Sequence, residues 1–471
     1  MYTASFLSDP DFIRVLYIFA FGCFIYGLHL LNHPRSARRG NIVAAVGMAI
    51  AVVATLLYDF VGDYLLIVLG IGLGTAVGVP AARSVKMTAM PQMVALFNGV
   101  GGGAVALISF VEYREALEHT GGNPVLEQLI PILFAGIVGS ISFWGSNIAF
   151  GKLQEILPGR PIQLPGQKFI NLGLLATAVG CAIAIAAGTE SQGLFLVILV
   201  SAAVLGNMFV LPIGGADMPV VISLLNAFTG LSAAAAGMAL DNVALIVAGM
   251  LVGASGSILT KQMAEAMNRS IANIFAGGFG GVSVTPGADG DGEQKPVRST
   301  DAADVAIQLA YASKVVVAPG YGMAVAQAQH TVRELADELE KRGIRVDFAI
   351  HPVAGRMPGH MNVLLAEADV PYDHLKEMDE INPEFAQTDV ALVIGANDVT
   401  NPAARENEGS PIYGMPILDV DKAAQVIVLK RSMNTGFAGI DNPLFYNENT
   451  ALLFGDAKES VAAVLSAVKE L

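Results

Sequence analysis

Long apolar segments dominate the chain before Lys261 and limit what it can fold into. Nine of them are separated by short connections, at residues 12–31, 40–58, 64–82, 91–111, 129–150, 169–187, 194–211, 220–238 and 243–259. Each has roughly the twenty residues that a helix needs to cross the hydrocarbon core of a bilayer. Because 54% of the whole chain is hydrophobic and only 14% is charged, we predict a bundle of about nine membrane-spanning helices over residues 1–263.

Positive charge is unevenly distributed over the connections between these segments. It follows the first and third segments and lies between the fifth and sixth, at Arg35, Arg38, Arg39, Arg83, Lys86, Lys152, Arg160 and Lys168. The alternate connections hold little besides Arg114, which has glutamates around it. Positively charged loops stay on the cytoplasmic side, so we expect an outer N-terminus and a cytoplasmic C-terminal region. The first segment, with no Lys or Arg before Arg14 and no cleavage site, is expected to be a retained span.

Polar side chains inside the apolar segments are candidates for function, because burying them in a bilayer is costly and they often mark a pathway. They are Asn98, Ser142, Asn147, Asn207, Asp217, Ser223, Asn226, Ser255 and Ser257. Hydroxyl and amide groups also link helices structurally, so both roles stay open for most of them. Asp217, near the cytoplasmic end of a predicted span, is a candidate for proton exchange, with a structural role as the alternative.

The pattern changes in the last part of the chain. Residues 264–300 are expected to be a linker, because residues 277–300 combine glycine, proline and charges without apolar periodicity. Beyond it, strands are predicted at residues 314–318, 345–350, 390–394, 425–429 and 451–454, and helices at 302–312, 324–342 and 458–471. This alternation predicts an α/β, Rossmann-like, doubly wound parallel sheet over residues 301–471. Its ligand should bind at the loops beyond the carboxyl ends of the strands, at residues 319–323, 351–360, 395–401 and 430–441.

A glycine turn follows the first predicted strand, with Gly320, Tyr321 and Gly322 at the start of a helical pattern. Such a turn lets a phosphate approach the N–H groups at a helix N-terminus. The third glycine of the dinucleotide fingerprint is replaced by Val325. The motif alone therefore fits an ordinary strand-to-helix turn as well as a nucleotide site.

A second group of candidates lies after the fourth predicted strand, where Lys430, Arg431 and Ser432 stand in a row. Two cations and a hydroxyl form a clamp for a phosphate, although such a pair on a surface is often only solvated. An NAD(H) site usually has a carboxylate at the end of the second strand, which holds the ribose 2′-hydroxyl. The second predicted strand here ends without one, so we expect NADP(H) rather than NAD(H). Asp398 either caps a turn or changes its proton affinity with the redox state of a bound nicotinamide.

Charge and cysteine content exclude several classes of function. From Asp301 onwards there are 25 acidic and 13 basic residues, a balance of −12, and a surface of that sign repels nucleic acid. Cys23 and Cys181 lie within apolar segments, so neither a disulfide nor a metal site is predicted. There is no metal-ligand spacing, Ser/His/Asp grouping or Walker loop. Hydride transfer needs none of them, because nicotinamide cofactors carry that chemistry.

Longer runs resemble a known family. They are GYGMAVAQAQ at residues 320–329, HPVAGRMPGHMNVLLAE at 351–367, GAND at 395–398, KRSMNTG at 430–436, GGADMPVV at 214–221 and AMNRS at 266–270. Together these runs resemble the beta subunits of proton-translocating NAD(P) transhydrogenases, over essentially the whole chain.

The resemblance implies a membrane domain and an NADP(H)-binding domain here, with NAD(H) on an alpha subunit that also supplies membrane helices. It implies a dimer of alpha-beta units in the inner membrane, in contact with lipid, and direct hydride transfer between NAD(H) and NADP(H) coupled to proton translocation. In this family NADP(H) lies across the sheet in the reverse of the usual orientation, which qualifies the role of the glycine turn.

The resemblance also implies site residues. Asp398 and Tyr321 become the candidate catalytic residues. Together with the turn positions Gly320, Gly322 and Val325, the residues expected to contact NADP(H) are Tyr321, Val353, Ala354, Gly355, Arg356, Met357, Pro358, Gly395, Ala396, Asn397, Asp398, Val399, Gly414, Met415, Lys430, Arg431, Ser432, Met433, Asn434, Thr435, Gly436, Phe437, Asp456 and Ala457. The expected proton pathway includes Asn98, Asp217, Asn226 and Arg269.

One position departs from the family pattern. Where some relatives have a histidine in the fourth span, this chain has Asn98, which cannot titrate. The proton-carrying group is then either on the partner subunit or a water molecule held by Asn98.

Two other functions are compatible with the same sequence. A transporter or channel gated by a cytoplasmic nucleotide-sensing domain would also combine nine spans with a Rossmann-like domain, but it predicts ion flux without a second dinucleotide. A membrane-anchored soluble reductase is disfavoured by the polar residues inside the spans.

Overall fold

The computed structural model describes residues 9–32, 34–57, 64–85, 89–119, 125–154, 156–158, 161–214, 217–266, 297–355, 359–408, 410, 412–436 and 438–471. The chain separates into two compact units, the first within residues 1–259 and the second consisting of residues 260–471 together with the short segments 159–161 and 213–220. Most of the predicted linker lies outside the described residues. The predicted limits of the two domains and the linker stay predictions.

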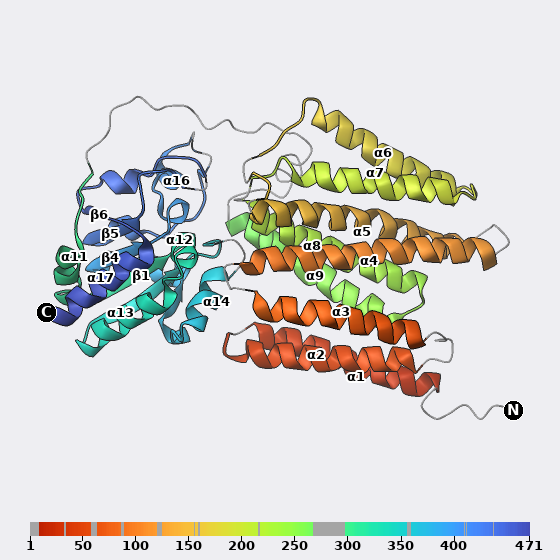
Figure 1. The fold of residues 1–471 in the computed structure, drawn as a ribbon, viewed down its shortest axis with the longest axis horizontal. Helices are drawn as coiled ribbons and strands as arrows, with labels where there is room; N and C mark the ends of the chain where they lie inside the picture. Colours follow the sequence, from red (N-terminus) through yellow and green to blue (C-terminus); the bar gives the residue numbers. More distant parts are fainter. Residues whose placement is uncertain are drawn as a thin grey trace. The chain divides into compact units, whose positions relative to one another are not determined.

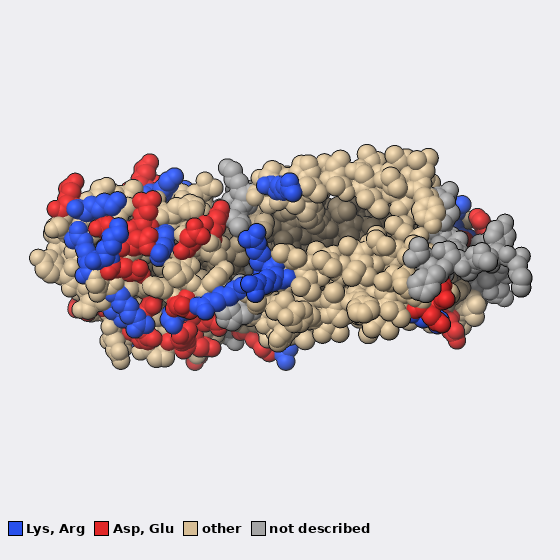
Figure 2. Space-filling model, turned by 90° about the horizontal axis from the view of Figure 1, so that it is seen from below, with Lys and Arg blue, Asp and Glu red and all other residues tan. Residues whose placement is uncertain are grey.

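The first unit is a helical bundle (Figure 1). Its helices are α1 (Pro10–Leu31), α2 (Pro34–Leu56), α3 (Tyr64–Ser84), α4 (Met90–His119), α5 (Leu126–Leu153), α6 (Gln167–Ala186), α7 (Gln192–Val210), α8 (Met218–Ala239) and α9 (Val243–Ala266). Within the described ranges these nine are long and apolar enough to cross a membrane, so the predicted bundle is confirmed. On the face shown in Figure 2, the described surface at the middle of this unit carries no charged side chain.

Two helices run farther than their apolar segments. α4 continues to His119 and α5 begins at Leu126, whereas the sequence predicted spans at 91–111 and 129–150. The predicted spans stop where charged residues such as Glu112 begin. Backbone hydrogen bonding does not depend on hydropathy, so the helices continue beyond the apolar boundary.

Small residues let several helices approach closely. A Cβ on Gly230 of α8 would lie 2.6 Å from the backbone nitrogen of Gly253 on α9, and one on Gly102 of α4 would lie 2.9 Å from the Gly139 carbonyl of α5. Helix α3 differs. Its glycines, Gly70, Gly72, Gly74 and Gly78, have open space where a Cβ would be, and none of its described residues is buried.

The second unit contains a six-stranded sheet in which every pair of neighbouring strands is parallel. The strands are β1 (Lys314–Pro319), β2 (Arg345–Ile350), β3 (Leu375–Glu377), β4 (Val390–Ile394), β5 (Gln425–Lys430) and β6 (Thr450–Phe454), in the spatial order β3-β2-β1-β4-β5-β6. This is the strand order of a Rossmann fold, so the predicted fold class is confirmed. Strands β1 and β4 are almost wholly buried, which explains their unbroken apolar sequences.

Helices cover the sheet (Figure 1). They are α11 (Ala302–Ala310), α12 (Tyr321–Val325), α13 (Gln329–Lys341), α14 (His360–Glu367), α15 (Met378–Ile381), α16 (Ala403–Glu406) and α17 (Ala457–Glu470). Helix α17 packs against both α11 and α13.

Several details of this unit differ from the prediction, including three helices that were not predicted, α14, α15 and α16. Strand β3 was missed, because three residues at a sheet edge give no periodicity to detect. The single helix predicted over residues 324–342 is two helices, since α12 ends at Val325 and α13 begins at Gln329. Between them Gln327 takes a positive φ of 51°, which interrupts helical hydrogen bonding.

Candidate functional site

The turns after β1 and β4 meet at the carboxyl edge of the sheet, where the strand order reverses. Pro319 and Ile394 are paired across these strands, so Gly320 and Gly395 begin neighbouring turns. A Cβ on Gly322 would lie 2.7 Å from the Cα of Gly395, and a Cβ on Gly320 would overlap the Gly395 carbonyl. Gly395 also has a φ of +66°. The glycines are therefore required by contact between two turns, whether or not a phosphate approaches them.

Two N–H groups of the turn after β1 already donate hydrogen bonds within the protein. Gly320 donates to the Ile394 carbonyl and Gly322 to the Gly395 carbonyl, both at 2.9 Å. These hydrogen bonds tie the two turns together and leave these two N–H groups committed. Val325, at the position of the missing third glycine, is the last residue of the short helix α12 and is 46% exposed. Because its side chain points away from the core, no glycine is needed there.

The loop after β2 lies beside the β1 turn. Ala354 is buried, and Gly355 has a φ of +109° with its Cα facing the ring of His360 at the start of α14. The ring of Tyr321 lies 6.3 Å from that of His360, measured between centroids. Arg356, Met357 and Pro358 lie outside the described residues, so only the first half of this predicted contact segment can be placed.

His351 joins the β2 loop to the segment that contains Gly414 and Met415. Its Nδ1 accepts from the Val353 N–H at 3.2 Å, and its Nε2 lies 2.8 Å from the Pro416 carbonyl. An N–H only donates and a carbonyl only accepts, so the ring is neutral with its proton on Nε2. His351 is almost completely buried. Burial lowers the pKa of His351 to about 4, against the opposing effect of the Pro416 carbonyl.

Lys430, the last residue of β5, and the loop that follows it to Asn442 form what we call the lid, of which all residues except 437 are described. Its first part holds Lys430, Arg431 and Ser432, and the side chains of Arg431 and Ser432 are exposed. The Lys430 ammonium lies 3.8 Å from the centre of the Phe445 ring. Burial lowers the pKa of Lys430, and the nearby Asp441 raises it. Three groups suited to a phosphate therefore stand together at the carboxyl end of a strand.

The lid folds back over the β4 loop. The Ala438 N–H donates to Oδ2 of Asp398 at 2.9 Å. A Cβ on Gly436 would lie 2.5 Å from Oδ1 of Asp398 and 2.6 Å from Nδ2 of Asn397. Ala396 is buried, whereas Asn397, Asp398 and Val399 are half-buried. Met433, Asn434 and Thr435 lie in the described lid, and Phe437 lies outside the described residues.

Other predicted contacts are spread along the same edge. Asp456 caps the N-terminus of α17, with Oδ1 accepting from the Lys458 N–H at 3.0 Å, and Ala457 is the first residue of that helix. Gly455 donates to the Lys430 carbonyl, which brings this capping turn beside the lid. Asp456 thus has a structural role of its own.

A polar cluster lies between α4, α5 and α8 in the helical unit. Nδ2 of the buried Asn98 donates to Ser146 Oγ at 2.9 Å and faces Ser142 Oγ at 3.4 Å. The Ser142 hydroxyl is 2.5 Å from that of Thr229 and 3.0 Å from the Leu225 carbonyl. Among the described residues, Oδ1 of Asn98 has no hydrogen-bond partner. A buried acceptor beside hydroxyl groups is a suitable place for water.

The other predicted proton-pathway residues lie on α8, just before it, or outside the described residues. Asn226 lies on α8, one turn before Thr229. Asp217 immediately precedes α8, nine positions before Asn226, which corresponds to a rise of about 13.5 Å along the helix. Arg269 lies outside the described residues. The structure therefore places Asn98 in a hydrogen-bonded cluster and Asp217 at the end of the same helix that carries Thr229.

Sequence reasoning missed several side chains in these two places. Ser146 and Thr229 were not singled out, although Ser142 and Ser146 are spaced to share one helix face. His351 was quoted only within a motif. Its link to Pro416 spans 65 residues, and no local pattern reveals such a contact.

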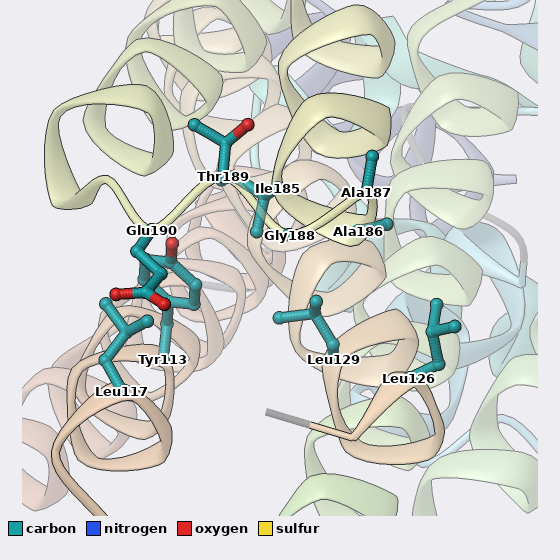
Figure 3. A pocket seen from close by; sticks show the side chains of 10 residues that line it. All are labelled: Tyr113, Leu117, Leu126, Leu129, Ile185, Ala186, Ala187, Gly188, Thr189 and Glu190. Carbon is teal, nitrogen blue, oxygen red and sulfur yellow. The ribbon is translucent and has the colours of Figure 1, made fainter. Parts of the chain in front are cut away.

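A separate cavity lies where α4 ends and α5 begins (Figure 3). It measures about 160 Å³ and is lined by Tyr113, Leu117, Leu126, Leu129, Ile185, Ala186, Ala187, Gly188, Thr189 and Glu190. None of these is a predicted site residue. The lining has no basic side chain, and the volume is below the roughly 300–1,000 Å³ of ligand pockets, so the cavity does not suit a dinucleotide.

Comparison with known proteins gives a consistent result. The family described as NAD(P) transhydrogenase beta subunit matches residues 13–467. The chain belongs to this family. Two relatives, both named NAD(P) transhydrogenase subunit beta and both from Rhodospirillum rubrum, one of them from a named strain, are 49% identical to it over 458 residues. The alignment covers 96% of this chain and 98% of the relative.

Membership of this family favours a transhydrogenase over the alternatives of a gated channel or a membrane-anchored soluble reductase. A beta subunit also implies an alpha subunit partner. The described helices and sheet fit this family as a membrane protein that carries a dinucleotide-type fold.

The neutral state of His351 predicts a pH-dependent stability. Between pH 6.5 and 4 an unfolded His351 binds a proton and the native one does not, so stability is intact above pH 6.5 and falls as pH decreases through this window. The loss reaches about 3 kcal/mol. His351→Gln should remove this part of the pH dependence in thermal unfolding of the detergent-solubilised chain. The control is His330→Gln, at an exposed position on α13, and equal pH dependence in both variants would contradict the assignment.

Proposed function

We propose that this chain binds NADP(H) at the carboxyl edge of its sheet and exchanges hydride with NAD(H) held by an alpha subunit. We further propose that this exchange is coupled to proton translocation through the helical unit. The observation that carries the proposal is the meeting of the β1 and β4 turns under the lid, at the point where ligands of doubly wound sheets bind.

The preference for NADP(H) rests on the first part of the lid. Lys430, Arg431 and Ser432 offer an ammonium, a guanidinium and a hydroxyl to a 2′-phosphate. The Lys430 ammonium lies over the Phe445 ring, and burial there lowers the pKa of Lys430 because it disfavours the charged form. A phosphate dianion beside this ammonium would favour its charged form. The nicotinamide rings supply the hydride chemistry, and the protein supplies position and electrostatics.

Asp398 and Tyr321 are proposed to act at the nicotinamide end of the site. Asp398 already accepts a hydrogen bond from the lid at Ala438. A protonated carboxyl is a weaker acceptor than a carboxylate, so a change in the protonation of Asp398 would change how firmly the lid is held. This gives proton binding a means of changing NADP(H) affinity, as coupling requires.

In the helical unit, the cluster around Asn98 supports the proposed proton route. Asn98 cannot titrate, but its unpartnered Oδ1 and the hydroxyls of Ser142, Ser146 and Thr229, all among the described residues, can hold water between helices. Asp217 would exchange the proton at the cytoplasmic end of α8, with Asn226 between them and Arg269 beyond the described part of the chain. Protons would move inward when NADH reduces NADP⁺.

The proposed partner is an alpha subunit that carries NAD(H) and further membrane helices, in a dimer of alpha-beta units. Two features support it. Helix α3 buries none of its described residues within this chain, and the helical unit is hollowed on the face shown in Figure 2. Both leave apolar surface that lipid or a partner's helices must cover. The assembly would lie in the inner membrane with the sheet unit in the cytoplasm.

The nucleotide preference gives the first test. Arg431→Ala should lower NADPH affinity about 10- to 100-fold and leave NADH affinity unchanged, because only NADPH carries the 2′-phosphate. Calorimetry on the purified full-length chain measures both affinities. Lys341→Ala, which removes an exposed lysine of α13, is the control and should change neither. A loss that is equal for the two nucleotides would contradict the phosphate site.

The membrane cluster gives a second test. Ser142→Ala removes the hydroxyl that joins α5 to Thr229 on α8, so proton uptake by vesicles containing the alpha-beta complex should fall at least several-fold. Ser255→Ala is the matched control, because Ser255 Oγ donates within its own helix to the Leu251 carbonyl. If the two variants translocate protons equally well, the route does not pass through this cluster.

A further inference from the structure

Two asparagines hold the second part of the lid, residues 438–442, against the β4 loop. Nδ2 of Asn401 donates to the Asp441 carbonyl at 3.0 Å, and Nδ2 of Asn442 donates to the carbonyl and to Oδ1 of Asn397, at 3.1 and 2.9 Å. Both asparagines are at most 1% exposed. We propose that Asn401 and Asn442 are positioning residues that keep residues 438–442 in place, so that only residues 431–435 open to release NADP(H).

Apolar packing holds the same part of the lid. Ala438 and Ile440 pack against a buried cluster formed by Ala404, Ile412, Met415 and Ile417. Opening this part would expose apolar surface as well as break the amide hydrogen bonds. The second part of the lid is therefore costly to move.

The first part of the lid, residues 431–435, has weaker contacts with the rest of the unit. Arg431, Ser432, Asn434 and Thr435 are exposed, and Met433 alone is half-buried, packed against the large core cluster that contains Val428 and Leu444. The hydrogen bonds described for this part are local and long, from Lys430 Nζ to the Asn434 carbonyl and from the Asn434 N–H to Ser432 Oγ, each 3.4 Å. Segments with few buried contacts open at low cost. The phosphate-binding groups thus lie on the part of the lid that opens easily.

A glycine, Gly436, separates the two parts. It lies directly against Asn397 and Asp398. A backbone that bends at Gly436 moves residues 431–435 while the asparagines keep 438–442 in position. The inference deepens the proposed function and depends on it for the identity of the ligand.

The amides of Asn401 and Asn442 have a second role that the test must separate. Oδ1 of Asn442 accepts from the Leu444 N–H, and Oδ1 of Asn401 accepts from the Ala403 N–H, each at 3.0 Å. Serine keeps a capping acceptor at such positions but is too short to reach across to the other loop. Asn442→Ser therefore removes the anchor and retains the cap.

Asn449→Ser is the matched control. Nδ2 of Asn449 donates to the carbonyls of Asp421 and Ala423, at 3.2 and 2.9 Å, so this variant also loses two amide hydrogen bonds in the same unit but none to the lid. Both variants should lower the thermal stability of the chain similarly. Only Asn442→Ser should change the behaviour of the lid.

The first measurement is the rate of NADPH release from the assembled alpha-beta complex, followed by stopped-flow fluorescence. Asn442→Ser should speed release about 10-fold, and Asn449→Ser less than twofold. Asn401→Ser serves as a second variant should Asn442→Ser fail to fold, with an increase in the same direction. Equal release rates in the lid variants and in Asn449→Ser would overturn the proposal.

The second measurement is amide hydrogen exchange of the complex without nucleotide. Residues 438–442 should exchange much more slowly than 431–435 in the wild type, and the difference should largely disappear in Asn442→Ser. Exchange of both parts at one common rate in the wild type would show that the lid opens as a unit and overturn the anchor. This measurement needs no bound ligand. Failure of the wild type to bind NADPH would overturn the proposed function alone.

Discussion

The contact between the turns after β1 and β4 is the constraint on which the rest of the site depends. Gly320, Gly322 and Gly395 allow two backbones to touch where side chains would collide, and two hydrogen bonds lock the turns together. The fixed edge that results positions the β2 loop on one side and the lid on the other. Substituting any of these glycines would separate the turns and displace the side chains that surround them.

Around this edge, some segments are held by buried hydrogen bonds, whereas the segment that carries the cationic side chains is held less firmly. The neutral, buried His351 connects two neighbouring loops rigidly, and Asp398, Asn401 and Asn442 hold the second part of the lid. The cationic first part has few such restraints. Binding energy from a phosphate can then be used to order this segment, which links nucleotide affinity to the position of the lid.

The sequence predicted the fold class well, because hydropathy and the alternation of strands and helices are local properties. Long apolar runs gave the helical bundle, and buried runs such as Val315–Val317 gave the parallel strands. Residues brought together from distant segments were harder to predict. Ser146 and Thr229 meet Asn98 and Ser142 only after three helices pack, and Asn442 reaches Asn397 across 45 residues. The role predicted for the glycine turn also changes, since contact with Gly395 requires those glycines independently of any phosphate.

Selection of NADP(H) by the carboxyl edge of the sheet can be measured by hydrogen exchange of the intact alpha-beta complex, with NADPH or with NADH at the same concentration. If the edge selects NADP(H), NADPH slows exchange in residues 320–323, 395–401 and 430–442 of this chain and NADH does not. Equal protection by both nucleotides, or protection confined to other segments, would contradict it.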